Sequence, residues 1–177
     1  RAQKRGGRGS LGGKTRQEDY IEHLFVASTH HSLMFFTEKG RCYWLKVYEV
    51  PQGSRTGRGK PIVNLFPLEE GEKINAILSV KEFDETRYIF MATALGTVKK
   101  TALIEFANPR KSGIIAINLD EGDYLIGAEV TNGANDIVLV SNGGKAVWFD
   151  EEAVRQMGRA TRGVRGMKLA ADQQVLS

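Results

Sequence analysis

The chain repeats itself about every 50 residues, and this repeat restricts the possible folds more than any other feature of the sequence. A glycine followed six residues later by a leucine occurs three times, as Gly59–Leu65, Gly113–Leu119 and Gly163–Leu169. A glycine turn between two apolar runs also occurs three times, at Gly40, Gly96 and Gly144, with offsets of 56 and 48 residues. Such a chain is expected to fold as one supersecondary unit per repeat, with neighbouring units burying a shared core.

Each repeat has the pattern of four short β-strands. Apolar runs rich in Val, Ile, Phe, Tyr and Trp end at Gly, Asn or Asp, as in strands joined by tight turns. The glycine turns should join the second and third strands as hairpins, because glycine supplies the positive φ that tight hairpins require. The expected strands are 23–29, 32–37, 41–48 and 61–66 in the first repeat, 74–80, 87–94, 97–102 and 114–119 in the second, and 126–131, 136–141, 145–149 and 165–169 in the third.

Repeated four-stranded antiparallel units predict an all-β, propeller-like fold with small sheets standing side by side around an axis. Three repeats do not close a ring, so we expect an incomplete ring that is part of a larger module. The predicted divisions are 1–18 for an N-terminal segment and linker, then 19–73, 74–125 and 126–177 for the three blade repeats. The aromatic residues that follow equivalent turns are expected in blade packing rather than base stacking; they are Tyr43, Trp44, Trp148 and Phe149.

The basic residues are segregated along the chain. Four windows, 1–16, 51–60, 99–111 and 155–168, hold 18 of the 25 Lys and Arg residues and a single acid, Glu105. The last three windows fall on or beside the connection between the third and fourth strands, so the repeats should present them at equivalent places. A rim of basic loops suits a polyanion that follows a defined path, and bent duplex DNA is the partner this predicts. The alternatives are ordinary solvated loops, or a scaffold whose basic loops hold an acidic protein.

Several function classes are excluded by composition. No stretch approaches the ~18 apolar residues of a membrane-spanning helix. The single cysteine, Cys42, cannot form an internal disulfide, and the three histidines lack zinc-ligand spacing. No nucleophile and base pattern or phosphate-binding loop occurs either. We therefore expect a cytoplasmic protein that has no membrane partner, no catalysis, no metal and no cofactor of its own.

The opening heptapeptide, Gln3-Lys4-Arg5-Gly6-Gly7-Arg8-Gly9, resembles the gyrase A box of the C-terminal domain of the A subunit of bacterial DNA gyrase. That box is usually Gln-Arg-Arg-Gly-Gly-Lys-Gly, so the two differences are Arg/Lys exchanges. The runs 91–101, 120–127 and 162–166 are also similar to this domain, and the resemblance covers essentially all 177 residues. The A-type subunit of topoisomerase IV, which has similar blades but no intact box, is the related alternative.

The resemblance implies a β-pinwheel, a propeller-like disc of six blades that exchange strands with their neighbours. It implies that the chain binds double-stranded DNA without sequence specificity, wraps it with positive handedness, and so supports ATP-dependent negative supercoiling. The implied partners are the rest of the gyrase A protein and the gyrase B protein in an A2B2 holoenzyme, in the bacterial cytoplasm at the nucleoid. The chain would then be a non-catalytic part of a type II topoisomerase, with ATP and magnesium used elsewhere in the holoenzyme.

The expected DNA contacts combine the box with the other basic windows. In the box, cations alternate with glycines, which let the backbone approach phosphates closely, and nothing in it reads bases. The predicted DNA-binding residues are Gln3, Lys4, Arg5, Gly6, Gly7, Arg8, Gly9, Arg55, Arg58, Lys60, Lys99, Lys100, Arg110, Lys111, Arg159, Arg162, Arg165 and Lys168.

Overall fold

The computed structural model describes residues 31–49 and 65–177. Its regular structure in these residues consists of β-strands and single 3-10 turns, which confirms the all-β prediction. The strands are β1 (Ser32–Thr37), β2 (Arg41–Lys46), β3 (Ile74–Val80), β4 (Tyr88–Thr93), β5 (Thr97–Ala102), β6 (Ile114–Ile115), β7 (Leu125–Thr131), β8 (Asp136–Val140), β9 (Ala146–Asp150) and β10 (Val164–Arg165). The 3-10 turns are η1 (Val47–Glu49), η3 (Leu103–Phe106) and η4 (Glu151–Ala153).

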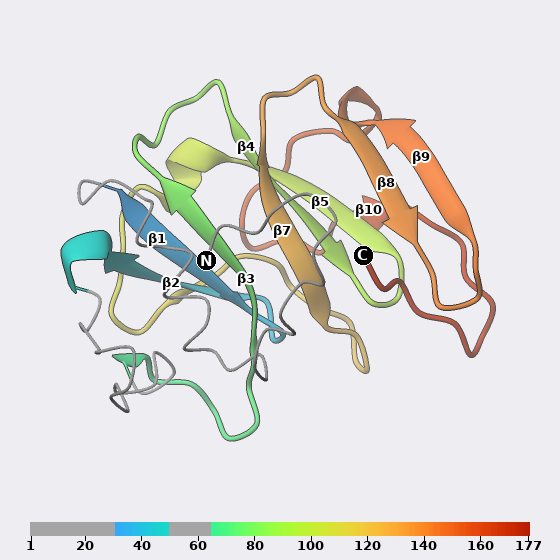
Figure 1. Ribbon diagram of the computed structural model, residues 1–177, viewed down its shortest axis with the longest axis horizontal. Helices are drawn as coiled ribbons and strands as arrows, with labels where there is room; N and C mark the ends of the chain where they lie inside the picture. The colour runs from blue at the N-terminus through green and yellow to red at the C-terminus, as the bar shows by residue number, and fades with distance from the viewer. Residues whose placement is uncertain (1–30, 50–64) are drawn as a thin grey trace, which may run out of the picture.

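The strands form three antiparallel sheets that stand side by side (Figure 1). Sheet A has the strand order β3-β1-β2-β6, sheet B has the order β7-β4-β5-β10, and sheet C is the β8-β9 hairpin. Each sheet is built around one of the hairpins predicted from a glycine turn. The hairpins begin at Ser32, Tyr88 and Asp136, with the offsets of 56 and 48 residues seen in the sequence. The structure thus confirms propeller-like blades in an arc that does not close.

Sheets A and B are completed by strands from farther along the chain. In sheet A, β3 pairs with β1 at one edge, and β6, which follows the hairpin of sheet B, pairs with β2 at the other. In sheet B, β7 pairs with β4, and β10, which follows the hairpin of sheet C, pairs with β5. A sheet and a sequence repeat are therefore different units, because neighbouring sheets share the strands of one repeat.

The outer strands are shorter than predicted. The sequence predicts strands over 114–119 and 165–169, whereas β6 and β10 contain two residues each. After β6, the N–H groups of Ala116 and Ile117 both donate to the carbonyl oxygen of Gly40, at 2.8 and 3.2 Å. The chain therefore bends around the hairpin turn instead of continuing the ladder. In the same way, the N–H groups of Gly166 and Met167 both donate hydrogen bonds to the carbonyl oxygen of Gly96 just after β10. The predicted strand 23–29 lies outside the described residues, as do residues 61–64 of the predicted strand 61–66. Residues 65 and 66 are described and are not in a strand.

Apolar side chains fill the spaces between the sheets. Met34 and Phe36 of sheet A pack with Ile89 and Met91 of sheet B, and a second cluster joins sheets B and C around Phe90. Tyr43 is buried in a third cluster on the other face of sheet A, as its predicted packing role requires. Trp148 differs from the prediction, with 70% of its surface exposed. The described residues include no further sheet that would cover its side of sheet C.

The hairpin turn at Gly40 cannot accommodate a side chain. Its φ is +78°, and a Cβ atom there would lie 2.5 Å from the carbonyl oxygen of Ile117. Gly122 has nearly the same φ of +79°, but its Cβ would meet nothing within 4 Å. We expect Gly122→Ala to lower the unfolding free energy by about 1–2 kcal/mol, the cost of the left-handed backbone. Gly40→Ala should lose roughly 1–3 kcal/mol more, because it also overpacks the junction.

Urea denaturation of the two variants measures this difference directly. Equal losses for Gly40→Ala and Gly122→Ala would show that the junction between the hairpin turn and the following segment tolerates a methyl group.

Candidate nucleic-acid interface

Two exposed basic connections lead into the outer strands of neighbouring sheets. The first basic connection, residues 107–113, joins η3 to β6 and carries Arg110 and Lys111. The second basic connection, residues 154–163, joins η4 to β10 and carries Arg159 and Arg162. Because β6 and β10 occupy equivalent edges of sheets A and B, the two connections present their cations at equivalent places. Arg165 in β10 and Lys168 just beyond it are exposed on the continuation of the second connection.

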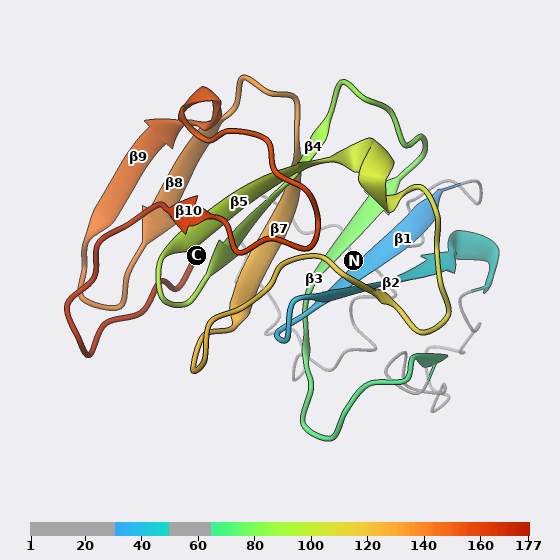
Figure 2. The same cartoon turned by 180° about the vertical axis from the view of Figure 1, so that it is seen from behind.

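The second basic connection is fastened to the segment that follows β6. The segment after β6 contacts the second connection through Asn118, whose backbone N–H donates to the Thr161 carbonyl and whose side-chain amide donates to the Ala160 carbonyl, both at 2.9 Å. The Arg162 guanidinium lies 3.3 Å from the Asp120 carboxylate. Figure 2 shows the yellow segment that includes β6 and the red segment that leads into β10 side by side across the molecule. The second connection of sheet B therefore packs against the segment that continues the outer strand of sheet A.

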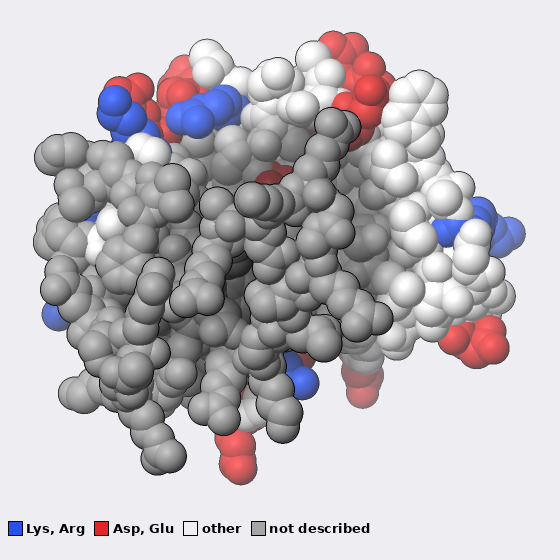
Figure 3. Space-filling model, in the orientation of Figure 1, with Lys and Arg blue, Asp and Glu red and all other residues white. Residues whose placement is uncertain are grey.

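Charges of both signs are visible at the margin of the molecule. In Figure 3, which is seen from the side of Figure 1, Lys and Arg atoms of the described residues lie at several places along the outline, and Asp and Glu atoms lie at others.

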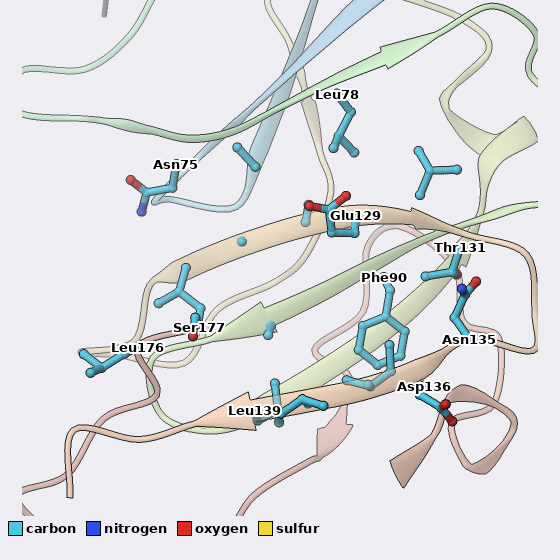
Figure 4. A pocket seen from close by; sticks show the side chains of 18 of the residues that line it. Asn75, Leu78, Phe90, Glu129, Thr131, Asn135, Asp136, Leu139, Leu176 and Ser177 are labelled. Carbon is cyan, nitrogen blue, oxygen red and sulfur yellow. The ribbon is translucent and has the colours of Figure 1, made fainter. Parts of the chain in front are cut away.

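A cavity of about 670 Å³ lies between the three sheets, alongside β7 and β8 (Figure 4). Its described lining is mostly apolar, as at Leu78, Phe90 and Leu139, and its charged groups are the carboxylates of Glu129 and Asp136. No Lys, Arg, His or Cys occurs among these lining residues, so they offer no cation for a phosphate group and no imidazole or thiol. The candidate site is therefore the exposed basic surface and not this cavity.

Two of the predicted DNA contacts, Lys99 and Lys100, are interior residues. They lie in β5, which is covered by strands on both sides, and their exposed fractions are 0% and 7%. Lys100 Nζ donates to the Glu151 carbonyl at 3.3 Å and lies 4.8 Å from the centre of the Tyr88 ring. The window 99–111 thus combines a buried strand with an exposed loop. In this conformation neither lysine can reach a phosphate, and we remove both from the set of surface contacts.

The remaining predicted contacts fall into two groups. The structure places six at or near the surface, with Arg159 half-buried: Arg110, Lys111, Arg159, Arg162, Arg165 and Lys168. The others lie outside the described residues and stay predictions: Gln3, Lys4, Arg5, Gly6, Gly7, Arg8, Gly9, Arg55, Arg58 and Lys60. Sequence reasoning missed Asn118, which fastens the second connection to the segment that follows β6. The sequence feature that could have drawn attention to Asn118 is an Asn-Leu pair that recurs in two repeats, as Asn64-Leu65 and Asn118-Leu119.

The described part of the chain holds no group of three or more His, Cys, Asp or Glu residues arranged to bind a metal ion. In the same part, no helix has both the length and the apolar character needed to cross a membrane.

Comparison with known proteins identifies the family. The family model described as "DNA gyrase C-terminal domain, beta-propeller" matches residues 1–28, 31–81, 87–132 and 135–177. The chain is 54% identical to the DNA gyrase A protein of Salmonella typhimurium over 176 residues, which is 99% of this chain and 20% of that protein. Against the Escherichia coli gyrase A protein the identity is 49% over 176 residues, with the same coverage. The chain thus spans about a fifth of the length of these curated relatives.

Solved structures agree with this match. A crystal structure of the C-terminal domain of DNA topoisomerase IV superimposes with a TM-score of 0.78 at 33% identity, covering 84% of this chain and 46% of that one. A structure of the DNA gyrase A C-terminal domain gives a TM-score of 0.69 at 27% identity, covering 85% and 48%. The two domains share one fold, and the family model and the curated relatives at 49–54% identity are those of gyrase A. This chain belongs to the family of the DNA gyrase C-terminal domain, the β-propeller part of the gyrase A protein.

Proposed function

We propose that this chain is the part of a gyrase A protein that binds duplex DNA and wraps it. Binding is independent of base sequence, the wrap has positive handedness, and it supports ATP-dependent negative supercoiling by the holoenzyme. In this role the chain catalyses no step itself. It acts with the rest of the gyrase A protein and with the gyrase B protein in an A2B2 assembly, in the bacterial cytoplasm at the nucleoid, while ATP and magnesium act elsewhere in that assembly.

The observation that supports the proposal is the equivalent placement of the two basic connections. Each leads into the outer strand of its sheet, so Arg110 beside sheet A and Arg162 beside sheet B are exposed at corresponding places of neighbouring sheets. Asn118 fastens the second connection to the segment that follows β6. Bending duplex DNA costs on the order of 1–6 kcal/mol for a 20–30 base-pair site. Only a row of phosphate contacts offsets that cost, and equivalent loops on successive sheets supply such a row. Their Lys and Arg side chains contact phosphates without reading bases.

A linking-number experiment tests the proposal. Relaxed circular DNA is incubated with increasing amounts of the chain, nicked and religated, and the topoisomers are then separated. Positive wrapping is expected to shift the linking number in the positive direction in proportion to bound protein. Absence of duplex binding in a parallel band-shift assay at 50 mM salt would contradict the proposal, and binding to an acidic protein instead would favour the scaffold.

Single substitutions in the basic connections should weaken binding in small steps. Each phosphate contact contributes about 0.9 to the slope of log affinity against log salt. We expect Arg110→Ala to reduce the magnitude of that slope by about 0.9, and the double variant with Arg162→Ala by about 1.8. The slopes are measured by fluorescence anisotropy with a labelled duplex. Lys73→Ala is the matched control, because Lys73 is exposed beside β3, at the edge of sheet A away from β6. If Lys73→Ala changes the salt slope as much as Arg110→Ala does, the slope depends on the total charge of the chain and not on contacts made by the basic connections.

A further inference from the structure

Lys99 binds the second basic connection from inside the molecule. Its Nζ donates hydrogen bonds to the carbonyls of Ala116 (2.7 Å), Thr161 (3.2 Å) and Arg159. Two of these three carbonyls belong to the second connection, and the third belongs to the segment that follows β6. The ammonium thus connects the same two segments as Asn118 does, from the side that faces the core.

The repeats show that this position can be filled in other ways. Lys99 is the third residue after the hairpin glycine, and the corresponding residues are Tyr43 in sheet A and Val147 in sheet C. Tyr43 lies against Gly113, where an added Cβ atom would be 2.6 Å from the Tyr43 ring. Lys99 lies against Gly163, where an added Cβ atom would be 3.1 Å from the Cβ atom of Lys99. The first basic connection therefore meets an aromatic ring, whereas the second meets an ammonium group with directed hydrogen bonds.

The energetics favour a close match between the ammonium and its acceptors. Burying a charge is costly unless the charged group is fully hydrogen-bonded. An ammonium has three donors, and three carbonyls surround this one. Since the carbonyls of Arg159, Ala160 and Thr161 all accept bonds from Lys99 or Asn118, the backbone of the connection is fixed against the core. The Arg162 side chain remains outside, with 75% of its surface exposed.

We propose that Lys99 is a positioning residue for DNA binding, whose side-chain amino group holds the second basic connection in the conformation that presents Arg159 and Arg162 to phosphates. This inference rests on the proposed function. It assigns Lys99 a role different from the direct phosphate contact predicted from the sequence, and it makes a buried residue as important to this part of the surface as the exposed arginines.

The charge on Lys99 should also make the hold depend on pH. Its pKa is lowered from 10.5 to about 8, chiefly by burial, with Glu105 opposing this effect and Arg159 adding to it. When the connection opens, water reaches the amine and its pKa returns toward the ordinary value, so the open conformation binds more protons between pH 8 and 10.5. The connection is therefore held more firmly at pH 9 than at pH 7. Arginines and phosphate diesters keep their charges over this interval.

The effect on global stability has the same sign. The folded-state pKa of about 8 lies below the unfolded value of 10.5, so the unfolded chain binds more protons between these two pH values. The contribution of Lys99 to the unfolding free energy consequently rises with pH across that window. DNA binding and stability should thus both rise with pH, whereas a role limited to packing by the Lys99 hydrocarbon chain leaves DNA binding unchanged.

The first test compares Lys99→Met with Lys100→Met in the intact chain. The rate of trypsin cleavage after Arg159 and Arg162, divided by the rate after Arg110, measures how readily the second connection opens when no DNA is bound. We expect Lys99→Met to raise this ratio at least about tenfold, because local opening controls proteolysis. It should also reduce the magnitude of the salt slope of DNA binding by about 1.8, for two lost contacts. Lys100→Met removes a buried charge from the same strand and should change neither quantity.

The second test is a pH series from 7 to 9. Affinity for duplex DNA should rise over this range in the unchanged chain and in Lys100→Met, and stay level in Lys99→Met. An unchanged cleavage ratio in Lys99→Met, or the same pH dependence in all three chains, would overturn the inference. If Lys99→Met does not fold, the cleavage ratio of the unchanged chain at pH 7 and 9 decides: it should be lower at pH 9, and a constant ratio contradicts the role of the Lys99 amine. Absence of DNA binding by the unchanged chain refutes the proposed function instead.

Discussion

The affinity of this chain for duplex DNA is expected to fall roughly 10³–10⁵-fold between 50 and 200 mM monovalent salt. Each phosphate that a lysine or arginine neutralises releases condensed counterions, and about six to ten such contacts give a fall of this size. The exposed cations of the two basic connections and of β10 supply about half of those contacts. The box and the 51–60 window, which lie outside the described residues, would supply the rest.

Fluorescence anisotropy with a duplex of 40 or so base pairs, repeated at five salt concentrations, measures the slope. A second duplex of unrelated sequence is the control, and it should give the same slope and affinity because phosphate contacts carry no sequence information. A nearly flat salt dependence would contradict binding along the basic surface. A strong preference for one duplex would indicate that base contacts have been overlooked.

Most of the fold follows from two kinds of local information in the sequence. Glycine turns such as Gly40 and Gly96 mark the hairpins, and the alternating or continuous apolar runs on either side mark the strands, so the predicted hairpins match the structure almost to the residue. The predicted outer strands are too long for a tertiary reason. Ile117 continues an apolar run, but its N–H bonds to Gly40, which is 77 residues earlier in the chain and is brought close only by strand exchange.

The candidate site is only partly predictable. Arg110 and Arg162 lie in loops marked by Gly, Pro or Ser, and their exposure follows from that setting. Sequence reasoning places Lys99 and Lys100 on the surface because charge is a reliable sign of exposure on an edge strand. In β5 that sign fails, since the chain that leads into β10 arrives from the next repeat and covers Lys99 and Lys100 with residues 156–161. A sequence pattern within one repeat contains no information on which strand of another repeat will cover it.

Replacing the three cations of the box with alanine, as Lys4, Arg5 and Arg8→Ala, is expected to abolish wrapping while most of the binding remains. Binding persists because the two basic connections are unchanged and still contact phosphates. Wrapping requires contacts far enough around the perimeter to offset the bending energy, which is on the order of 1–6 kcal/mol per 20–30 base pairs. The box adds three cations at one end of the chain, and its glycines let the backbone approach phosphates.

Two control variants separate the box from total charge. Removing three cations elsewhere, as Arg110, Lys111 and Arg162→Ala, should weaken binding more than the box variant does, yet leave a linking-number shift per bound molecule. Exchanging Lys4→Arg and Arg8→Lys keeps the charge and restores the usual order of the family's box, so wrapping should survive. The linking number of religated circular DNA, measured at equal occupancy, compares all three variants with the unchanged chain. If the box variant still wraps DNA, the heptapeptide is only one more source of positive charge, and the contacts that hold the bend must lie elsewhere on the perimeter.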